Sequence, residues 1–234
     1  MTLAPRLAPT PVPVLRPSEY TAALIDVLRR RASSISGKSA LEIGSGSGVI
    51  LATLGSLDAT SLCGVDIEPM AIAASTQLMS ALGFGTKVEL LCGDLWDPVE
   101  GRQFDVVVAN LPHFPMRDAG ISGRLPTWSA GGADGRRLLD PFLQGLGRHL
   151  APGGRAIITH NGFVGLDRSR AALASTGLGL RVADSGLVYV GDEKLALMTD
   201  IVRRTEEGRT LHRFGPYTFA DLLIVEIGTP DVLG

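Results

Sequence analysis

The sequence lacks any uninterrupted run of about 18 apolar residues, the length that a membrane-spanning helix requires. Its first segment, MTLAPRLAPTPVPVLRP (residues 1–17), carries prolines where a secretory signal peptide needs an apolar stretch. We therefore expect residues 1–17 to form an extended arm, and we expect the protein to make no membrane contact.

The chain also lacks an excess of basic residues, since its formal net charge is −2. Proteins that bind nucleic acid normally show a basic excess or a basic stripe. The charge balance therefore does not favour a nucleic-acid partner.

Cysteine and metal-binding patterns are similarly sparse. The two cysteines, Cys63 and Cys92, lie in apolar strand-like runs, which is typical of a reduced cytoplasmic protein without disulfides. The four histidines show no metal-ligand spacing with each other or with the cysteines, so we predict no metal site. Nothing in the sequence sets the oligomeric state, and a homodimer stays open.

After a first helical stretch, apolar strand-like runs alternate with helical stretches from residue 39 onward, as in a parallel doubly wound sheet. The strand-like runs are 39–44, 61–67, 87–93, 104–110, 155–160, 180–190 and 221–228, and the helical stretches are 19–31, 48–57, 69–82, 136–150 and 193–206. At 234 residues the chain fits one domain, which we place at residues 18–234.

The first strand runs into a glycine loop, LEIGSGSGVI, in which Gly44, Gly46 and Gly48 precede a helix. Such a loop lets the backbone approach a ligand at the carboxyl edge of the sheet. A nicotinamide fingerprint requires a last glycine where this chain has Val49. The observed spacing, preceded by Glu42, favours S-adenosylmethionine and disfavours a nicotinamide dehydrogenase.

Acidic residues end the next two strands. Asp66 is placed to accept hydrogen bonds from both ribose hydroxyls, with Ile67 beside it as a further cofactor contact, although a helix cap is the alternative role for this aspartate. Asp94 is placed to accept from an adenine amino group, with Leu95 or Trp96 against the ring, although a turn-forming role is the alternative.

The fourth strand ends in DVVVANLPHFP (105–115), where Asn110 is followed by Pro112 and Pro115. Together with VDIEPMAIAASTQLMSALG (65–83), AGGADGRRLLDPFLQGLGRHLAPGG (130–154) and RPSEY (16–20), this segment resembles the HemK-type class I S-adenosylmethionine-dependent methyltransferases. NLPH (110–113) is similar to the Asn-Pro-Pro-Tyr motif of that family. The resemblance covers about residues 16–162 and implies a Rossmann-like, doubly wound seven-stranded sheet, mostly parallel with an antiparallel last strand.

The resemblance also implies roles for single residues. The Asn110 side-chain oxygen and the Leu111 carbonyl would accept hydrogen bonds from the nitrogen to be methylated, and Asn110 would also lie against the cofactor. Pro112 would fix the direction of these acceptors, since proline restricts the backbone. The alternative for Asn110 is a turn cap at the strand end.

Four further residues are candidate substrate contacts or bases. His113 replaces the family tyrosine that stacks on a planar amide, and Phe114 is a candidate to take over that stacking. His160, which replaces an acidic residue after strand five, and His113 are candidates to accept a proton from a substrate ammonium. Tyr217 belongs to an aromatic segment within an insertion, residues 191–220, that we interpret as a substrate lid or as an ordinary crossover.

The family carries a helical N-terminal recognition domain, for which this chain has only about 18 residues before its first helix. The sequence therefore favours N-methylation of a small amino- or amide-bearing compound, or of a short peptide. The alternatives are methylation of protein glutamine, methylation of an RNA base amine, and a non-catalytic S-adenosylmethionine-binding protein.

Overall fold

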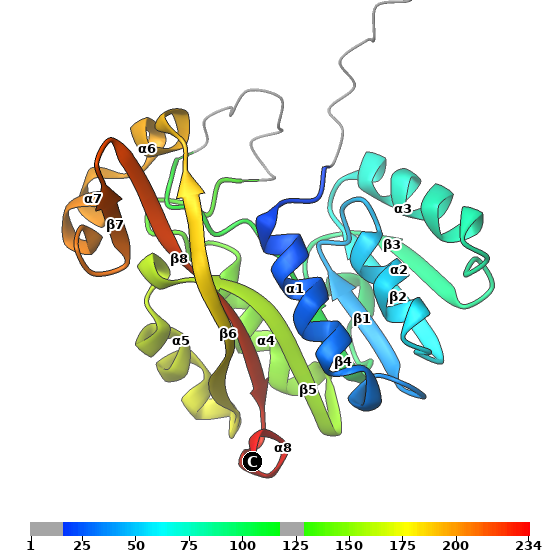
Figure 1. Ribbon diagram of the computed structural model, residues 1–234. Coiled ribbons are helices and arrows are strands. Elements are labelled where there is room, and N and C mark those ends of the chain that lie inside the picture. The colour runs from blue at the N-terminus through cyan, green and yellow to red at the C-terminus, as the bar shows by residue number, and fades with distance from the viewer. Residues whose placement is uncertain (1–15, 118–128) are drawn as a thin grey trace, which may run out of the picture.

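The computed structural model describes residues 16–117 and 129–234 (Figure 1). The predicted arm lies outside these residues except for Arg16 and Pro17. Among the residues that the structure describes, no helix is both long and apolar enough to cross a membrane.

An eight-stranded sheet forms the centre of the molecule, with seven strands in the order β3-β2-β1-β4-β5-β8-β6 and a short β7 paired to β8. The strands are β1 (Ser39–Ile43), β2 (Ser61–Asp66), β3 (Val88–Cys92), β4 (Phe104–Ala109), β5 (Leu150–Asn161), β6 (Gly179–Val190), β7 (Leu211–Phe214) and β8 (Tyr217–Gly228). Neighbouring strands from β3 to β5 pair in parallel, and β8 pairs antiparallel with β5, β6 and β7. The predicted doubly wound sheet with an antiparallel last strand is confirmed, and β7 is one strand more than expected.

Helices cover both faces of this sheet (Figure 1). The helices are α1 (Glu19–Arg30), α2 (Val49–Ser56), α3 (Pro69–Ala81), α4 (Leu139–His149), α5 (Leu166–Leu173), α6 (Asp192–Leu197), α7 (Asp200–Glu206) and α8 (Pro230–Leu233). One layer contains α1, α2 and α3, and the other contains α4 and α5.

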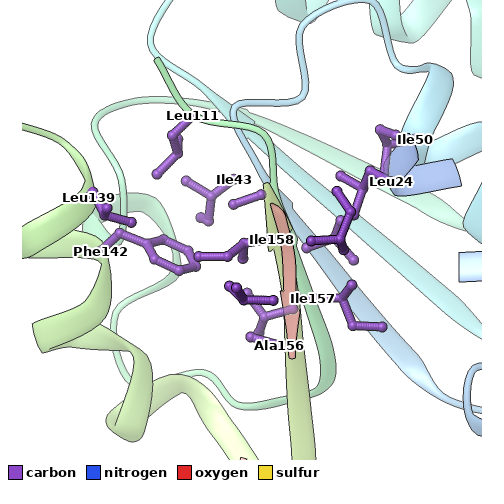
Figure 2. Close-up of a cluster of buried hydrophobic side chains, with 14 of the residues drawn as sticks. Leu24, Ile43, Ile50, Leu111, Leu139, Phe142, Ala156, Ile157 and Ile158 are labelled. Atoms are coloured by element: carbon purple, nitrogen blue, oxygen red, sulfur yellow. The ribbon is translucent and has the colours of Figure 1, made fainter. Parts of the chain in front are cut away.

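The core lies between these layers and the central strands, as Figure 2 shows. Leu24 of α1 and Ile157 lie on one side of β5, and Phe142 of α4 lies on the other with Ile158. Residues 106–109 of β4 form a continuous apolar run because this part of the strand is buried on both faces, as is usual for a central parallel strand.

Three local predictions differ from the structure. The fourth helix begins at Leu139, not at Arg136, whose buried guanidinium donates to Asp140 of α4 and to the Val164 carbonyl before α5. The insertion contains two short helices and the strand β7 where one helix and a loop were expected. α5 was not predicted, since its sequence LDRSRAAL has a weak apolar face.

Candidate functional site

A cavity of about 370 Å³, here called the larger cavity, lies at the carboxyl ends of the parallel strands. Its wall comes from the N-terminus of α1 and from the segments that follow β1, β2, β3 and β4, with Arg137 and Leu138 completing it. A binding cavity at this edge of the sheet is the arrangement that the doubly wound topology favours.

The glycine loop after β1 lines this cavity at two of its three predicted glycines. Gly44 and Gly46 have φ values of 77° and 51°, in the left-handed region that favours glycine. Gly48 is not among the residues that line the cavity, so its predicted cofactor contact stays a prediction. A Cβ atom on Gly48 would lie 3.0 Å from Ser75, so this glycine allows α2 to pack against α3.

Two carboxylates hold the loop in place from the cavity wall. Glu42 is buried and its Oε2 accepts the backbone N–H of Leu51 at 3.1 Å, in the first turn of α2. Asp66 accepts the backbone N–H of Gly46 at 2.8 Å and that of Glu68 at 2.9 Å. Burial raises the pKa of both carboxyl groups. Because a carboxylate can accept about four hydrogen bonds, Asp66 retains capacity for a ligand.

The turn after β3 brings Asp94 and Leu95 to the same cavity, as does the turn after β2 for Ile67. Leu95 has a φ of 42°, an uncommon conformation for leucine that places it at the cavity edge. Trp96 is buried away from the cavity and stacks on His149 with ring centroids 4.5 Å apart. Of the two candidates for the adenine face, only Leu95 lines the cavity.

Asn110 lies where the larger cavity meets a second one. Its Oδ1 accepts the Thr159 hydroxyl at 2.9 Å, and its Nδ2 donates to Thr21 Oγ1 at 3.2 Å. These two threonines, from β5 and α1, fix the positions of the carboxamide oxygen and nitrogen. Leu111 and Pro112 line both cavities together with Asn110.

The second cavity, here called the smaller cavity, has a volume of about 100 Å³. It is lined by Ser18, Tyr20, Asn110, Leu111, Pro112, His113, Phe114, Ser129, Asn161 and Lys194. The predicted substrate residues Pro112 and Phe114 and the predicted catalytic residue His113 are therefore brought together in one wall.

Burial keeps His113 uncharged. Desolvation lowers its pKa to about 4, against a smaller opposing effect of the Leu111 backbone carbonyl. The ring packs edge-on against Tyr20, with centroids 5.5 Å apart. Phe114 packs edge-on against Phe163, and the Lys194 ammonium lies 5.9 Å from the Phe114 ring centre.

Two predicted substrate residues line neither cavity. His160 is fully buried on the α5 side of β5, where Nε2 lies 2.9 Å from Ser169 Oγ and desolvation lowers the pKa to about 3. The alternation of side chains along β5 gives Thr159 and Asn161 to the cavity side and His160 to the opposite side. Tyr217 is 56% exposed at the start of β8 and packs against Tyr189.

A glycine segment that carried no predicted role supports the wall of the smaller cavity. A Cβ atom on Gly131 would lie 2.7 Å from the His113 Cα, and one on Gly135 would lie 2.5 Å from the His113 carbonyl oxygen. The Gly131 N–H donates to the Phe114 carbonyl at 2.8 Å. Glycine is therefore needed at positions 131 and 135 of the GGADG sequence, because the backbone of this segment contacts the backbone of His113 there.

The insertion contacts the same wall. Lys194 of α6 lines the smaller cavity. Thr199, between α6 and α7, donates its N–H to the Pro115 carbonyl at 2.8 Å and its hydroxyl to the Ala133 carbonyl at 2.6 Å.

Sequence reasoning missed several lining residues, namely Arg16, Thr21, Tyr20, Ser129 and Asn161, together with Thr159 behind Asn110. The only signals available were the RPSEY and GGADG resemblances, which marked segments but assigned no role. Their importance becomes visible only when α1, β5 and the segment before α4 meet.

The larger cavity fits S-adenosylmethionine by the chemistry of its wall. It presents the carboxylates of Glu42, Asp66 and Asp94, guanidinium groups, and the apolar side chains of Ile67 and Leu95. The buried Ser45 hydroxyl lines it, and among the residues described Ser45 Oγ has no hydrogen-bond partner. This mixture suits a ligand with ribose hydroxyls, a planar base and a charged amino acid end.

Comparison with known families places residues 40–122 in a methyltransferase domain family. A Methanocaldococcus jannaschii protein, MJ0928, is 30% identical over 186 residues, which cover 79% of this chain and 92% of that protein. Its name gives a protein N5-glutamine methyltransferase and marks that activity as provisional. The release factor glutamine methyltransferase of Gloeobacter violaceus is 31% identical over 60% of this chain but only 52% of its own length.

Among solved structures, the Mtq2–Trm112 complex from E. cuniculi, which methylates the termination factor eRF1, has a TM-score of 0.61 at 20% identity. The match covers 93% of this chain and 99% of that one, and it shows a shared fold. The glycine loop, the strand-end carboxylates and the coverage of MJ0928 agree with one another. The chain belongs to the HemK-like class I methyltransferases and is an enzyme whose cofactor is S-adenosylmethionine.

Proposed function

We propose that this methyltransferase acts on the nitrogen of a neutral primary amide, the side chain of glutamine presented by a polypeptide. The observation that carries the proposal is the position of Asn110, whose fixed carboxamide lies between the larger and the smaller cavity. A cofactor in the larger cavity and an acceptor in the smaller one would meet at this residue.

The charge of the smaller cavity favours an amide over an amine. Burial raises the pKa of Tyr20 to about 12 and lowers that of His113 to about 4, so both side chains are neutral near pH 7. No carboxylate is among the lining residues that the structure describes, and Lys194 is one of the groups that lower the His113 pKa. An alkylammonium group would therefore enter without a counter-charge, at an energetic cost that a neutral amide does not incur.

The expectation that a histidine accepts a proton from a substrate ammonium loses its support. An alkylammonium pKa of about 10 exceeds that of His113 by about six units, so this proton transfer would be strongly unfavourable. His160 lies outside both cavities.

The roles of the chain's residues in the transfer follow from their positions. When bound, the cofactor supplies a methyl group already activated by a positive sulfur. Asn110 Oδ1, which has a second lone pair beyond its bond to Thr159, accepts an N–H of the acceptor, and the Leu111 carbonyl accepts the other. These bonds direct the nitrogen at the methyl carbon and stabilise the positive charge that develops before the proton leaves to water.

A polypeptide substrate is supported by the relative MJ0928. The match to MJ0928 covers 92% of that protein, whose name gives a protein glutamine substrate. Most of the length of that protein is therefore shared with this chain. A small amide-bearing compound is the second candidate, favoured by the small volume of about 100 Å³.

We also propose that α6 forms one side of the acceptor entrance. Its Lys194 lines the smaller cavity, and Thr199, which follows α6, donates hydrogen bonds to the Pro115 and Ala133 carbonyls. Tyr217 does not belong to this entrance, because it is exposed on β8 and is not among the residues that line either cavity.

Incubation with S-adenosylmethionine and N-acetyl-L-glutamine methylamide tests the proposal, with the site of methylation located by mass spectrometry. Transfer of one methyl group to the side-chain nitrogen is expected. Methylation of amine probes in place of this amide would overturn it.

A further inference from the structure

The smaller cavity contains a polar group that the protein itself leaves without a partner. Ser129 is only 6% exposed and lines this cavity, and among the residues described its Oγ has no hydrogen-bond partner. A buried hydroxyl without a partner is costly, which points to a ligand that completes its hydrogen bonding.

Asn161, at the end of β5, supplies a second polar group to the same cavity. Tyr20 donates its hydroxyl to Asn161 Oδ1 at 2.8 Å, and burial keeps this hydroxyl protonated by raising the Tyr20 pKa to about 12. Because this bond holds Oδ1 against Tyr20, the Nδ2 amide with its two N–H donors lies on the other side of the carboxamide and is the group that we assign to a ligand. Tyr20 therefore sets the orientation of Asn161.

The polar groups of the smaller cavity thus divide into two kinds. Asn110 Oδ1 and the Leu111 carbonyl are acceptors, at the junction with the larger cavity. Asn161 Nδ2 and Ser129 Oγ are donors, and both residues line only the smaller cavity. A primary amide has the complementary arrangement, with an N–H₂ group at one end and a carbonyl oxygen at the other.

We propose that Asn161, oriented by Tyr20, and Ser129 bind the carbonyl oxygen of the acceptor amide and so make the site selective for amides over amines. This inference rests on the proposed function and assigns specificity to residues outside the NLPH segment. Neither residue touches the nitrogen that receives the methyl group. An acceptor with a methylene in place of the carbonyl would leave both donors unpaired, and sites built to hydrogen-bond a substrate group strongly reject analogues that lack it.

The experiment compares two probes whose covalent structures differ only at this carbonyl, N-acetyl-L-glutamine methylamide and N-acetyl-L-ornithine methylamide, the second of which carries an ammonium group at neutral pH. In Asn161→Asp the side chain still accepts the Tyr20 hydroxyl but loses both N–H donors. We expect kcat/KM for the amide probe to fall roughly 10- to 100-fold, and the ornithine probe to bind more tightly as a competitive inhibitor. Ser129→Ala should lower kcat/KM for the amide roughly 5- to 10-fold.

Ser169→Ala is the matched control, because Ser169 is a buried serine that lines neither cavity. This variant should keep the preference for the amide, and all three variants should bind S-adenosylmethionine within about threefold of the wild type. Unchanged amide kinetics in both Asn161→Asp and Ser129→Ala would overturn the inference while leaving the proposed function standing. A wild-type enzyme that does not methylate the amide probe would overturn both.

Discussion

The two cavities are built in different ways although they share Asn110, Leu111 and Pro112. The larger one consists mostly of segments that directly follow β1 to β4, and backbone geometry at the glycine loop shapes it. The smaller one is assembled from side chains that are far apart in sequence, from Ser18 to Lys194.

Under the proposed function, the larger cavity serves a constant ligand, the cofactor, and the smaller cavity serves a variable one, the acceptor. The strand-end positions are fixed by the sheet itself, so the same short motifs serve any acceptor. The acceptor wall depends on which side chains α1, β5 and α6 present, and these can change without altering the sheet. The division teaches that cofactor and acceptor recognition are separable in this fold, and four substitutions test it.

The largest expected effect comes from the residue shared by both cavities. Asn110→Ala removes the carboxamide that orients the acceptor, and we expect kcat to fall on the order of 10³-fold because positioning and charge stabilisation are lost together. Calorimetry should give cofactor affinity within a few fold of the wild type. Normal turnover by this variant would show that acceptor positioning does not depend on Asn110.

Gly135→Ala should damage the smaller cavity and spare the larger one. The new Cβ would lie 2.5 Å from the His113 carbonyl oxygen at a φ of 77°, so strain and overpacking together should destabilise the fold by about 2–4 kcal/mol. Gly101→Ala is the control, since its φ of 73° is similar but no atom lies within 4 Å of the new Cβ. Chemical denaturation measures both, and equal losses would argue against the close backbone contact.

Acid should destabilise the protein through the buried His113. Its pKa falls from 6.5 to about 4 on folding, so between these values the unfolded chain binds more protons and stability falls as pH is lowered. His113→Gln should remove about 3 kcal/mol of this pH dependence between pH 6.5 and 4. Urea titrations across this window give the slope, with His160 still titrating in both proteins.

The smallest effect is expected at Thr159, a positioning residue behind Asn110. Thr159→Val removes the hydroxyl that donates to Asn110 Oδ1 at 2.9 Å, and about 1 kcal/mol of orienting interaction should be lost. This should lower kcat roughly fivefold with little change in KM for the acceptor. Thr76→Val, an exposed helix threonine bonded to Ile72, provides the comparison. A rise in KM alone would indicate a direct substrate contact.

Most of the fold and the larger cavity could be predicted from the sequence because both depend on local patterns. The strand-end placement of Asp66, Asp94 and Asn110 follows directly from apolar runs that end at a polar residue. At Gly48 the sequence shows that a glycine is needed, but it does not show that Ser75 of α3 approaches it closely.

The smaller cavity was predictable only in part, since its wall is tertiary. His160 and Asn161 are adjacent in sequence, yet strand alternation sends one into the core and the other to the cavity. Which of the two faces the cavity depends on the side of the sheet that α1 covers. The pairing of Tyr20 with Asn161 joins positions 141 residues apart, and no local pattern reports it.

The order of the lining residues along the chain has a consequence for biosynthesis. Among the residues described, those that line the larger cavity lie between Arg16 and Leu138, whereas the smaller cavity also includes Asn161 and Lys194. As the chain leaves the ribosome, the described wall of the larger cavity is translated before that of the smaller one is complete, and Thr199, which bonds to the Pro115 and Ala133 carbonyls, follows. A nascent chain that ends after β5 would thus hold these larger-cavity residues while the smaller cavity still lacked Lys194.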